Sequence, residues 1–236
     1  MADLSRKDIW KMFDTISPTY DRVNRWMTFG LDLYWRGKMA SFLPIGKDLI
    51  LLDCATGTAD QALSLMQKSP HIAKIIGIDL SEEMLAQGKK KIRKTTFTEK
   101  IELKKASALE IPYANEMFHC VTISFGIRNV VDVNACLTEM LRVLKPGGKA
   151  LILETSLPEN RALRKMHGTY LQKILPKLGG WISKKQNAYE YLQKTAESFP
   201  SGHAFCRLLT QAGFHQAICH PLTLGVVSIY EAEKSL

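Results

Sequence analysis

Two aspartates and a run of small residues are the groups in this sequence best suited to hold a charged small molecule. The stretch LLDCATGTAD (51–60) carries Asp53 directly ahead of that run. Backbone N–H groups in such a turn can approach a ligand closely, and a helix that follows adds the positive end of its dipole. The spacing Asp53-x-Ala55-x-Gly57-x-Ala59 keeps a single Gly, which argues against the three-glycine fingerprint of a dinucleotide site.

A second carboxylate, Asp79, ends the next apolar run, 22 residues beyond Gly57. At that place a carboxylate can accept hydrogen bonds from both hydroxyls of a ribose. Asp53 could hold a ligand ammonium through ordered water. A nucleoside with an amino-acid tail and no phosphate fits these groups, and S-adenosylmethionine is such a molecule. The alternative for Asp79 is an acid that stabilises the dipole of the following helix.

The elements that must position these groups alternate between β-type runs and helical periodicity. Strands are predicted at 48–55, 73–81, 100–107, 118–126 and 149–156, and helices at 58–69, 82–94 and 133–144, with Ser81 as the cap of the second helix. This alternation predicts a parallel sheet with helices on both faces and a ligand site at the carboxyl ends of the strands. Residues 213–233 predict two closely spaced final strands, an antiparallel pair at one sheet edge.

We expect one domain spanning 1–236. Its predicted parts are an N-terminal helical lid (1–45), a cofactor-binding core (46–158), a helical substrate cover (159–200), and a C-terminal helix with edge strands (201–236). Hydrophobic residues make up 46% of the chain, which is enough for one large core.

The composition narrows the classes of partner and location. The N-terminus has no apolar signal region and no run reaches the length of a membrane span, so a cytoplasmic location is expected. The net charge of +9 permits a nucleic acid or an anionic membrane surface as partner, but no RNA-binding or zinc-finger motif accompanies it. Five scattered cysteines predict buried thiols, with neither disulfides nor a metal site.

Three further motifs carry a resemblance to a known family. YDRVNRWMTFGLDLYW (20–35), SFGIRNV (124–130) and the less specific RVLKPGGK (142–149) resemble stretches of the UbiE/MenG family, the S-adenosylmethionine-dependent C-methyltransferases of quinone biosynthesis. The likeness runs from about 13 to 230. It implies a Rossmann-like class I fold with a mostly parallel seven-stranded sheet and one antiparallel edge strand. It also implies methylation of a polyprenyl quinol, preferably demethylmenaquinol, by a protein that contacts the membrane peripherally or forms a homodimer.

The resemblance also implies roles for single residues. The cofactor contacts carried over are Thr58, Asp79, Ser107, Ala108 and Ser124, and they join Asp53 and Gly57 from the turn. The alternatives are a helix cap for Thr58, a plain loop at 107–108 and a local backbone bond for Ser124.

The motifs at 20–35 and 124–130 supply the residues expected to act on the substrate. A quinol ring carbon becomes nucleophilic when a neighbouring hydroxyl loses its proton, and Arg128 could stabilise that phenolate while Asn129 holds the second ring oxygen. Tyr20 and Asp21 could close over the substrate, and water held by Asp21 or Arg128 could take the ring proton. The alternatives are a surface salt bridge for Arg128, a turn role for Asn129, and a helix-breaking turn at Tyr20 and Asp21.

The sequence departs from the family pattern at several positions. These are Val23, Thr28, Asp32, Thr56, Ala59, Ser107 and His119. Two other functions stay open: methylation of a different small molecule, and a non-catalytic subunit that keeps the fold. The altered glycine turn is the best support for the second. Nucleic acid is not expected as a substrate, because the sequence has neither an acceptor-side motif such as NPPY nor an RNA-binding appendage.

Overall fold

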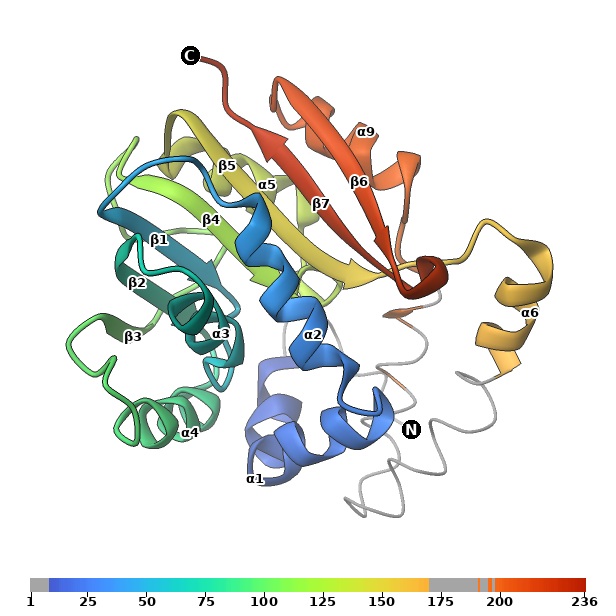
Figure 1. Cartoon of the computed structure of the whole chain (residues 1–236), viewed down its shortest axis with the longest axis horizontal. Coiled ribbons are helices and arrows are strands. Elements are labelled where there is room, and N and C mark those ends of the chain that lie inside the picture. Colours follow the sequence, from blue (N-terminus) through green and yellow to red (C-terminus); the bar gives the residue numbers. More distant parts are fainter. Residues whose placement is uncertain (1–8, 170–190, 192–194, 197) are drawn as a thin grey trace.

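A computed structural model of the protein describes residues 9–169, 191, 195–196 and 198–236 (Figure 1). Its elements are, in chain order, α1 (Ile9–Met27), α2 (Leu31–Lys38), η2 (Met39–Phe42), β1 (Leu49–Cys54), α3 (Asp60–Lys68), β2 (Ile72–Asp79), α4 (Glu82–Ile92), β3 (Ile101–Lys105), β4 (Phe118–Ser124), η3 (Ile127–Asn129), α5 (Val133–Val143), β5 (Leu144–Thr155), α6 (Arg161–Thr169), α9 (His203–Gln211), β6 (Gln216–Leu222), η5 (Thr223–Gly225) and β7 (Val227–Glu233). The expected alternation of strands and helices through the core is confirmed.

The strands form one seven-stranded sheet in the order β3-β2-β1-β4-β5-β7-β6. The first five strands are parallel, and β7 pairs antiparallel with both β5 and β6. The fold class and the antiparallel pair at the edge are therefore as expected. The strand that runs against the others is β7, one place in from the edge. Strand order reverses between β1 and β4, which places a ligand crevice beyond their carboxyl ends.

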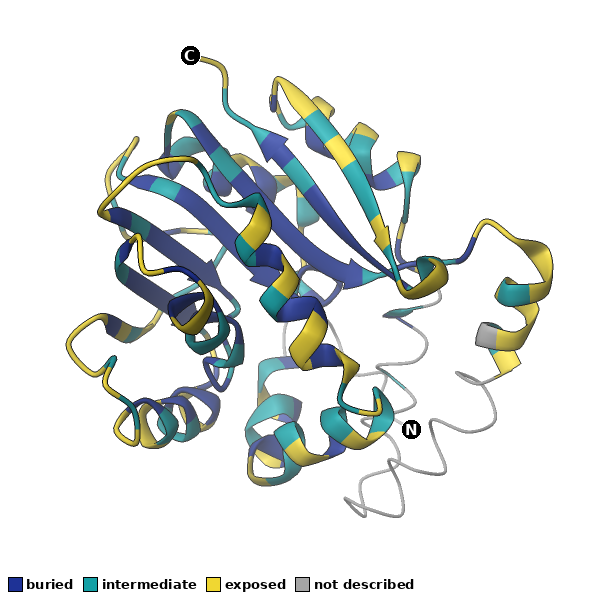
Figure 2. Ribbon diagram, viewed as in Figure 1, coloured by how far each residue is buried: buried dark blue, intermediate teal, exposed yellow. Residues whose placement is uncertain are grey.

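Alternating side chains divide the interior into two cores, one on each face of the sheet. Leu52 belongs to the core under α5 and α9, and its neighbour Leu51 to the core under α2 and α3. This alternation is what a strand buried on both faces requires. Figure 2 shows the central strands buried along most of their length and the outer faces of the helices exposed.

The N-terminal helix α1 packs against α4. Its apolar stripe, made by Ile9, Met12, Ile16 and Val23, meets Met84 of α4. In the predicted substrate cover, α6 is largely exposed, and residues 170–190 lie outside the described residues. No helix in the described part combines the length and apolar character that a bilayer crossing needs.

Local signals set several element boundaries. The side chain of Ser81 caps α4 by accepting a hydrogen bond from the Met84 N–H at 3.1 Å, as predicted. Helix α3 begins at Asp60, two residues later than predicted, because Ala59 holds a left-handed conformation that a helix cannot contain. Strand β5 begins at Leu144, so the KPGG segment that was expected to separate helix from strand is part of the strand.

Candidate active site

The turn between β1 and α3 bends by placing alternate residues in left-handed conformation. Ala55 has φ 47°, Gly57 φ 55° and Ala59 φ 65°. A left-handed Ala costs about 1–2 kcal/mol relative to the right-handed form, so the turn stores strain at two of its three bends. Small side chains are what make this path possible, and they leave the backbone of the turn uncovered toward the crevice.

The turn and strand β2 together fix the carboxylate of Asp79. One oxygen accepts a hydrogen bond from Gly57 N–H at 2.8 Å, and the other accepts from Ser81 N–H at 2.9 Å. Burial raises the pKa of Asp79, and these amide donors oppose that rise. The carboxylate therefore supports the start of α4, as the alternative reading held, and it also lines the main cavity.

The main cavity lies over the carboxyl ends of the parallel strands and holds about 870 Å³ of space, part of it open to solvent. The predicted residues that line it are Tyr20, Gly57, Asp79, Ser107, Ala108, Ser124 and Asn129. Apolar side chains from α1, among them Ile9, Trp10 and Phe13, cover another part of it. The cavity thus joins a polar region at the strand ends to an apolar region under the lid.

Two serines at the cavity have partners within the protein. Ser107 Oγ accepts a hydrogen bond from Leu109 N–H at 3.1 Å, which leaves its hydroxyl proton available to another acceptor. Ser124 Oγ donates to Gln61 Oε1 at 2.8 Å. Ser124 therefore bonds to a side chain of α3 and not to a local backbone group.

Asn129 and Tyr20 both line the main cavity. Asn129 is only 8% exposed, and its Oδ1 atom is buried and has no hydrogen-bond partner within the described structure. Such a group is costly unless a ligand or water satisfies it. Burial raises the pKa of Tyr20, against the opposing effects of Asn24 and of the positive charges of Arg36 and Arg128. At neutral pH the Tyr20 hydroxyl keeps its proton and can donate it in a hydrogen bond.

Arg128 differs from its expected role as a free cation at the substrate. Its guanidinium pairs with Glu154, which is fully buried at the end of β5. Neither the sequence motif nor the surface salt-bridge alternative includes this buried partner. The pair carries no net charge, and Arg128 is absent from the residues that line the main cavity.

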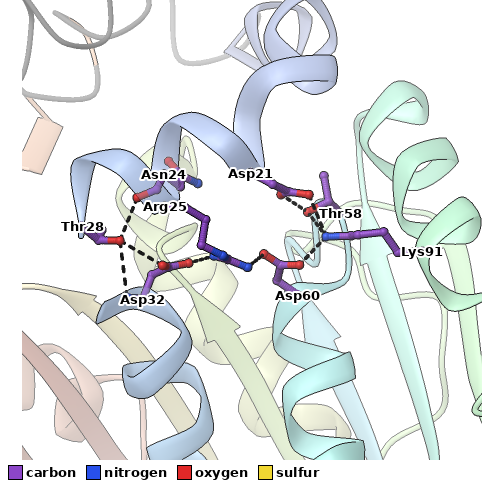
Figure 3. A network of polar contacts seen from close by, with 8 residues as sticks. All are labelled: Asp21, Asn24, Arg25, Thr28, Asp32, Thr58, Asp60 and Lys91. Atoms are coloured by element: carbon purple, nitrogen blue, oxygen red, sulfur yellow. Dashed lines mark hydrogen bonds and ion pairs between the residues drawn. The ribbon is translucent and has the colours of Figure 1, made fainter. Parts of the chain in front are cut away.

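Asp21 and Thr58 also differ from expectation, because they bond to each other and face Lys91 (Figure 3). Thr58 Oγ1 donates to Asp21 at 2.6 Å, and the Lys91 ammonium contacts Asp21 at 2.8 Å and Thr58 at 2.9 Å. Lys91 also pairs with Asp60. The hydroxyl of Thr58 is therefore taken up by the contact between lid and core and is not directed at the main cavity.

The same network continues along α1 to α2 through Arg25 (Figure 3). Arg25 pairs with Asp60 at 2.8 Å and with Asp32, and Asp32 accepts a hydrogen bond from Thr28 at 2.9 Å. Two departures from the family pattern, Thr28 and Asp32, are thus partners of each other. Helix α1 is thus linked by side-chain contacts to α2, α3 and α4.

Asp53 lies deeper, in a smaller cavity beside the main one. Its two oxygens accept hydrogen bonds from the hydroxyls of Thr56 and Thr122, each at 2.6 Å. Burial raises its pKa to about 6, although the two hydroxyls and the charge of Arg36 act against that rise. Thr56, another departure from the family pattern, therefore takes part in holding this carboxylate.

Sequence reasoning missed several residues of the site. Arg36 lines the smaller cavity, Lys91 links lid and core, and Trp10 lines the main cavity. For Trp10 the apolar periodicity of α1 was an available signal. Arg36 directly follows the motif at 20–35, so its position was an available signal, whereas Lys91 lies in an ordinary charged helical stretch that nothing marks.

Comparison with known proteins decides the family. Residues 1–234 match the ubiE/COQ5 methyltransferase family. The chain belongs to this family. The ubiquinone/menaquinone biosynthesis C-methyltransferase UbiE of Geotalea daltonii is 42% identical over 229 residues, which cover 96% of each chain. The demethylmenaquinone methyltransferase of Chlorobaculum parvum is 42% identical over 234 residues, 98% of this chain and 94% of that one.

Solved structures show the same fold as this ubiE/COQ5 family member. A SAM-dependent methyltransferase of Thermotoga maritima, described as a possible histamine N-methyltransferase, aligns with a TM-score of 0.69 over 96% of this chain and 100% of its own. Its identity to this chain is 19%, so the likeness extends to the fold alone. The family motifs predicted from the sequence are confirmed by the family match.

Proposed function

We propose that this protein transfers a methyl group from S-adenosylmethionine to a ring carbon of a polyprenyl quinol, with demethylmenaquinol as the preferred acceptor. Membership of the ubiE/COQ5 methyltransferase family and the names of its relatives support the reaction class. The observation that carries the proposal is the main cavity itself. It joins a fixed carboxylate at the strand ends to an apolar region under α1, with the unpartnered carboxamide oxygen of Asn129 lining it.

The polar region fits the nucleoside part of S-adenosylmethionine, which when bound supplies an activated methyl group on a sulfonium. Asp79 is held by two amides and can accept from ribose hydroxyls. Ser107 and Ala108 line the same cavity as Asp79 and would hold the adenine. Gly57 also lines this cavity, and a Cβ placed on it would meet no atom within 4 Å, so its backbone is open to the ligand. Asp53 supplies negative charge behind the turn. These residues give the donor group the carboxylates and the uncovered backbone that it requires.

The apolar region suits a quinol ring. A free phenol has a pKa near 10, so ionising a ring hydroxyl at neutral pH costs about 4 kcal/mol. Asn129 Oδ1, buried without a partner among the described residues, can accept a hydrogen bond from a ring hydroxyl and so orient the ring, while the proton lost on ionisation passes to water. Tyr20 can donate to the second ring oxygen. We expect Arg128, tied to Glu154, to support the structure of the site without direct contact with the ring.

An assay with labelled S-adenosylmethionine tests the reaction. Demethylmenaquinol and the corresponding benzoquinol are offered separately, and mass analysis locates the new methyl group. We expect methylation on carbon and faster turnover of the naphthoquinol. Binding of S-adenosylmethionine without transfer to either quinol would refute the proposal and favour a non-catalytic subunit.

Asn129→Ala isolates the acceptor half of the site. We expect turnover to fall at least about tenfold, since the hydrogen bond that orients the quinol ring is lost, while the affinity for S-adenosylhomocysteine stays within about twofold. Asn134→Ala, at an exposed position of α5, is the matched control. Equal turnover of the two variants at saturating quinol would remove Asn129 from the mechanism.

A peripheral contact with the membrane belongs to the same proposal, because a polyprenyl quinol resides in the bilayer. Large apolar side chains are exposed at the junction of α1 and α2, with Trp26 60%, Phe29 77% and Tyr34 56% exposed. Exposed aromatic residues are typical of membrane interfaces. We expect Trp26→Ser with Phe29→Ser to reduce co-sedimentation with anionic liposomes. Unchanged co-sedimentation, or a loss of dimer in its place, would count against this contact.

A further inference from the structure

Among the residues that the structure describes, the buried cation of Arg36 has no anionic partner. Arg36 lies on α2 and is 7% exposed, and its guanidinium makes no hydrogen bond or ion pair with any residue that the structure describes. Its Nε atom is buried without a partner. Its charged group lies over the ring of Phe125, 5.3 Å from Cζ to the ring centroid. A buried charge in that state is costly unless a ligand pairs with it.

Arg36 lines the smaller cavity, which is continuous in its lining with the main one. The two share Tyr20, Ala55, Gly57 and Ser124 as lining residues. The smaller cavity holds about 300 Å³ of space, including open solvent, beyond the left-handed turn and away from the ribose-binding Asp79. In a ligand that spans both cavities, the part opposite the nucleoside would reach Arg36.

The acids near Arg36 are committed elsewhere. Asp60 pairs with Arg25 and Lys91, so its charge is already balanced. Asp53 lines the same cavity, but Thr56 and Thr122 hold both of its oxygens. The cavity is therefore lined by an acid whose oxygens each keep a second acceptor site, and by a guanidinium that pairs with no acid among the described residues. That arrangement is complementary to a zwitterionic α-amino acid.

We propose that Arg36 is the receptor for the α-carboxylate of the methionine part of the methyl donor, with Asp53 facing its ammonium. This inference rests on the proposed function, because it takes S-adenosylmethionine as the donor. Phe125 orients the guanidinium by stacking, and its own left-handed backbone, φ 56°, brings the ring beside α2. An arginine fork also matches the geometry of a carboxylate better than a lysine does.

Calorimetry with two ligands and two proteins tests the contact without any quinol. The ligands are S-adenosylmethionine and its decarboxylated form, and the proteins are the wild type and Arg36→Met. We expect the wild type to bind the decarboxylated form roughly 30-fold more weakly, as the loss of a charge-assisted pair implies. Arg36→Met should bind the two ligands within about threefold of each other, because neither can make the pair. Arg36→Lys should restore part of the preference.

A purely structural role for Arg36 gives a different result. If Arg36→Met bound both ligands more weakly by the same factor, it would keep the wild-type preference for S-adenosylmethionine over the decarboxylated form. That result would overturn the proposal. The wild-type comparison stands alone if the variant does not fold: equal affinity for both ligands would refute the carboxylate contact. Failure of the wild type to bind either ligand would instead refute the proposed function. Arg93→Met, at an exposed position after α4, is the control and should keep the wild-type preference.

Discussion

The buried carboxyl group of Asp53 makes the stability of this protein depend on pH. Its exposure is 1%, and burial raises its pKa from 3.8 to about 6. The folded chain therefore holds this proton more tightly than the unfolded chain does. The free energy of unfolding falls as the pH rises from about 3.8 to about 6 and is constant above that. At neutral pH the ionised group costs the fold about 3 kcal/mol.

Asp53→Asn removes that cost while keeping the shape of the side chain. Asn offers one acceptor and one donor, so either Thr56 or Thr122 must rotate its hydroxyl to accept, and about 1 kcal/mol of hydrogen bonding is lost. We expect the variant to gain about 2 kcal/mol of unfolding free energy at pH 8. At pH 5 the cost of ionisation in the wild type is about half as large, so the gain shrinks by about 1.4 kcal/mol.

Urea denaturation followed by circular dichroism measures this difference at both pH values. Glu99→Gln removes an exposed carboxylate and should leave the unfolding free energy unchanged within about 0.5 kcal/mol. A variant that is no more stable than the wild type at pH 8 would refute the reasoning. So would a gain of the same size at pH 5, because the cost of burying a charge must follow its ionisation.

The same substitution should weaken the cofactor site. A positively charged ligand group beside Asp53 favours the ionised form, so the affinity of the wild type for S-adenosylhomocysteine should rise between pH 5 and pH 7. In Asp53→Asn we expect weaker binding, by roughly tenfold, and no such rise over this range. Stability gained at the expense of binding is the pattern expected when a site keeps a destabilising charge for its function.

Three further substitutions test other parts of the structure. Lys91→Met should lower the unfolding free energy by about 1–2 kcal/mol, because the lid loses its link to the core. It should also raise the KM for the quinol more than it lowers kcat. Unchanged KM and stability would contradict this role of Lys91. Arg128→Met should lower the unfolding free energy, measured by urea denaturation, by about 3 kcal/mol or more, since Glu154 is left buried and unpaired. Adding Glu154→Gln should recover most of this loss. A double variant as unstable as the single one would exclude the unpaired charge as the cause. Gly126→Ala would place a Cβ 2.7 Å from the Ala55 Cβ and should lower stability by about 1–3 kcal/mol, with Ala55→Gly restoring it in thermal unfolding; no rescue would mean that another contact is responsible.

Much of the fold could be predicted because each core strand is set by its own residues. Strand β1 is an apolar run that ends at a turn of small residues, and Ser81 marks the start of α4 by its own hydrogen bond. Adjacent parallel strands place their carboxyl ends on one edge, so Asp79 and Gly57 were expected to meet without knowledge of the helices. The exact start of α3 was missed because a left-handed Ala is not marked in the sequence.

The sequence by itself determined the sheet, the turn and the cluster of groups at the strand ends, since these follow from local periodicity and from the geometry of parallel strands. Only the tertiary structure decided which charges pair. The partner of Arg128 lies 26 residues away, and Lys91 reaches Asp21 from 70 residues away. Such pairings depend on how helices pack on the sheet, and no local pattern records that. Packing therefore tied Arg128, Asp21 and Thr58 to protein groups and left Arg36 without an anionic partner in the described part of the chain.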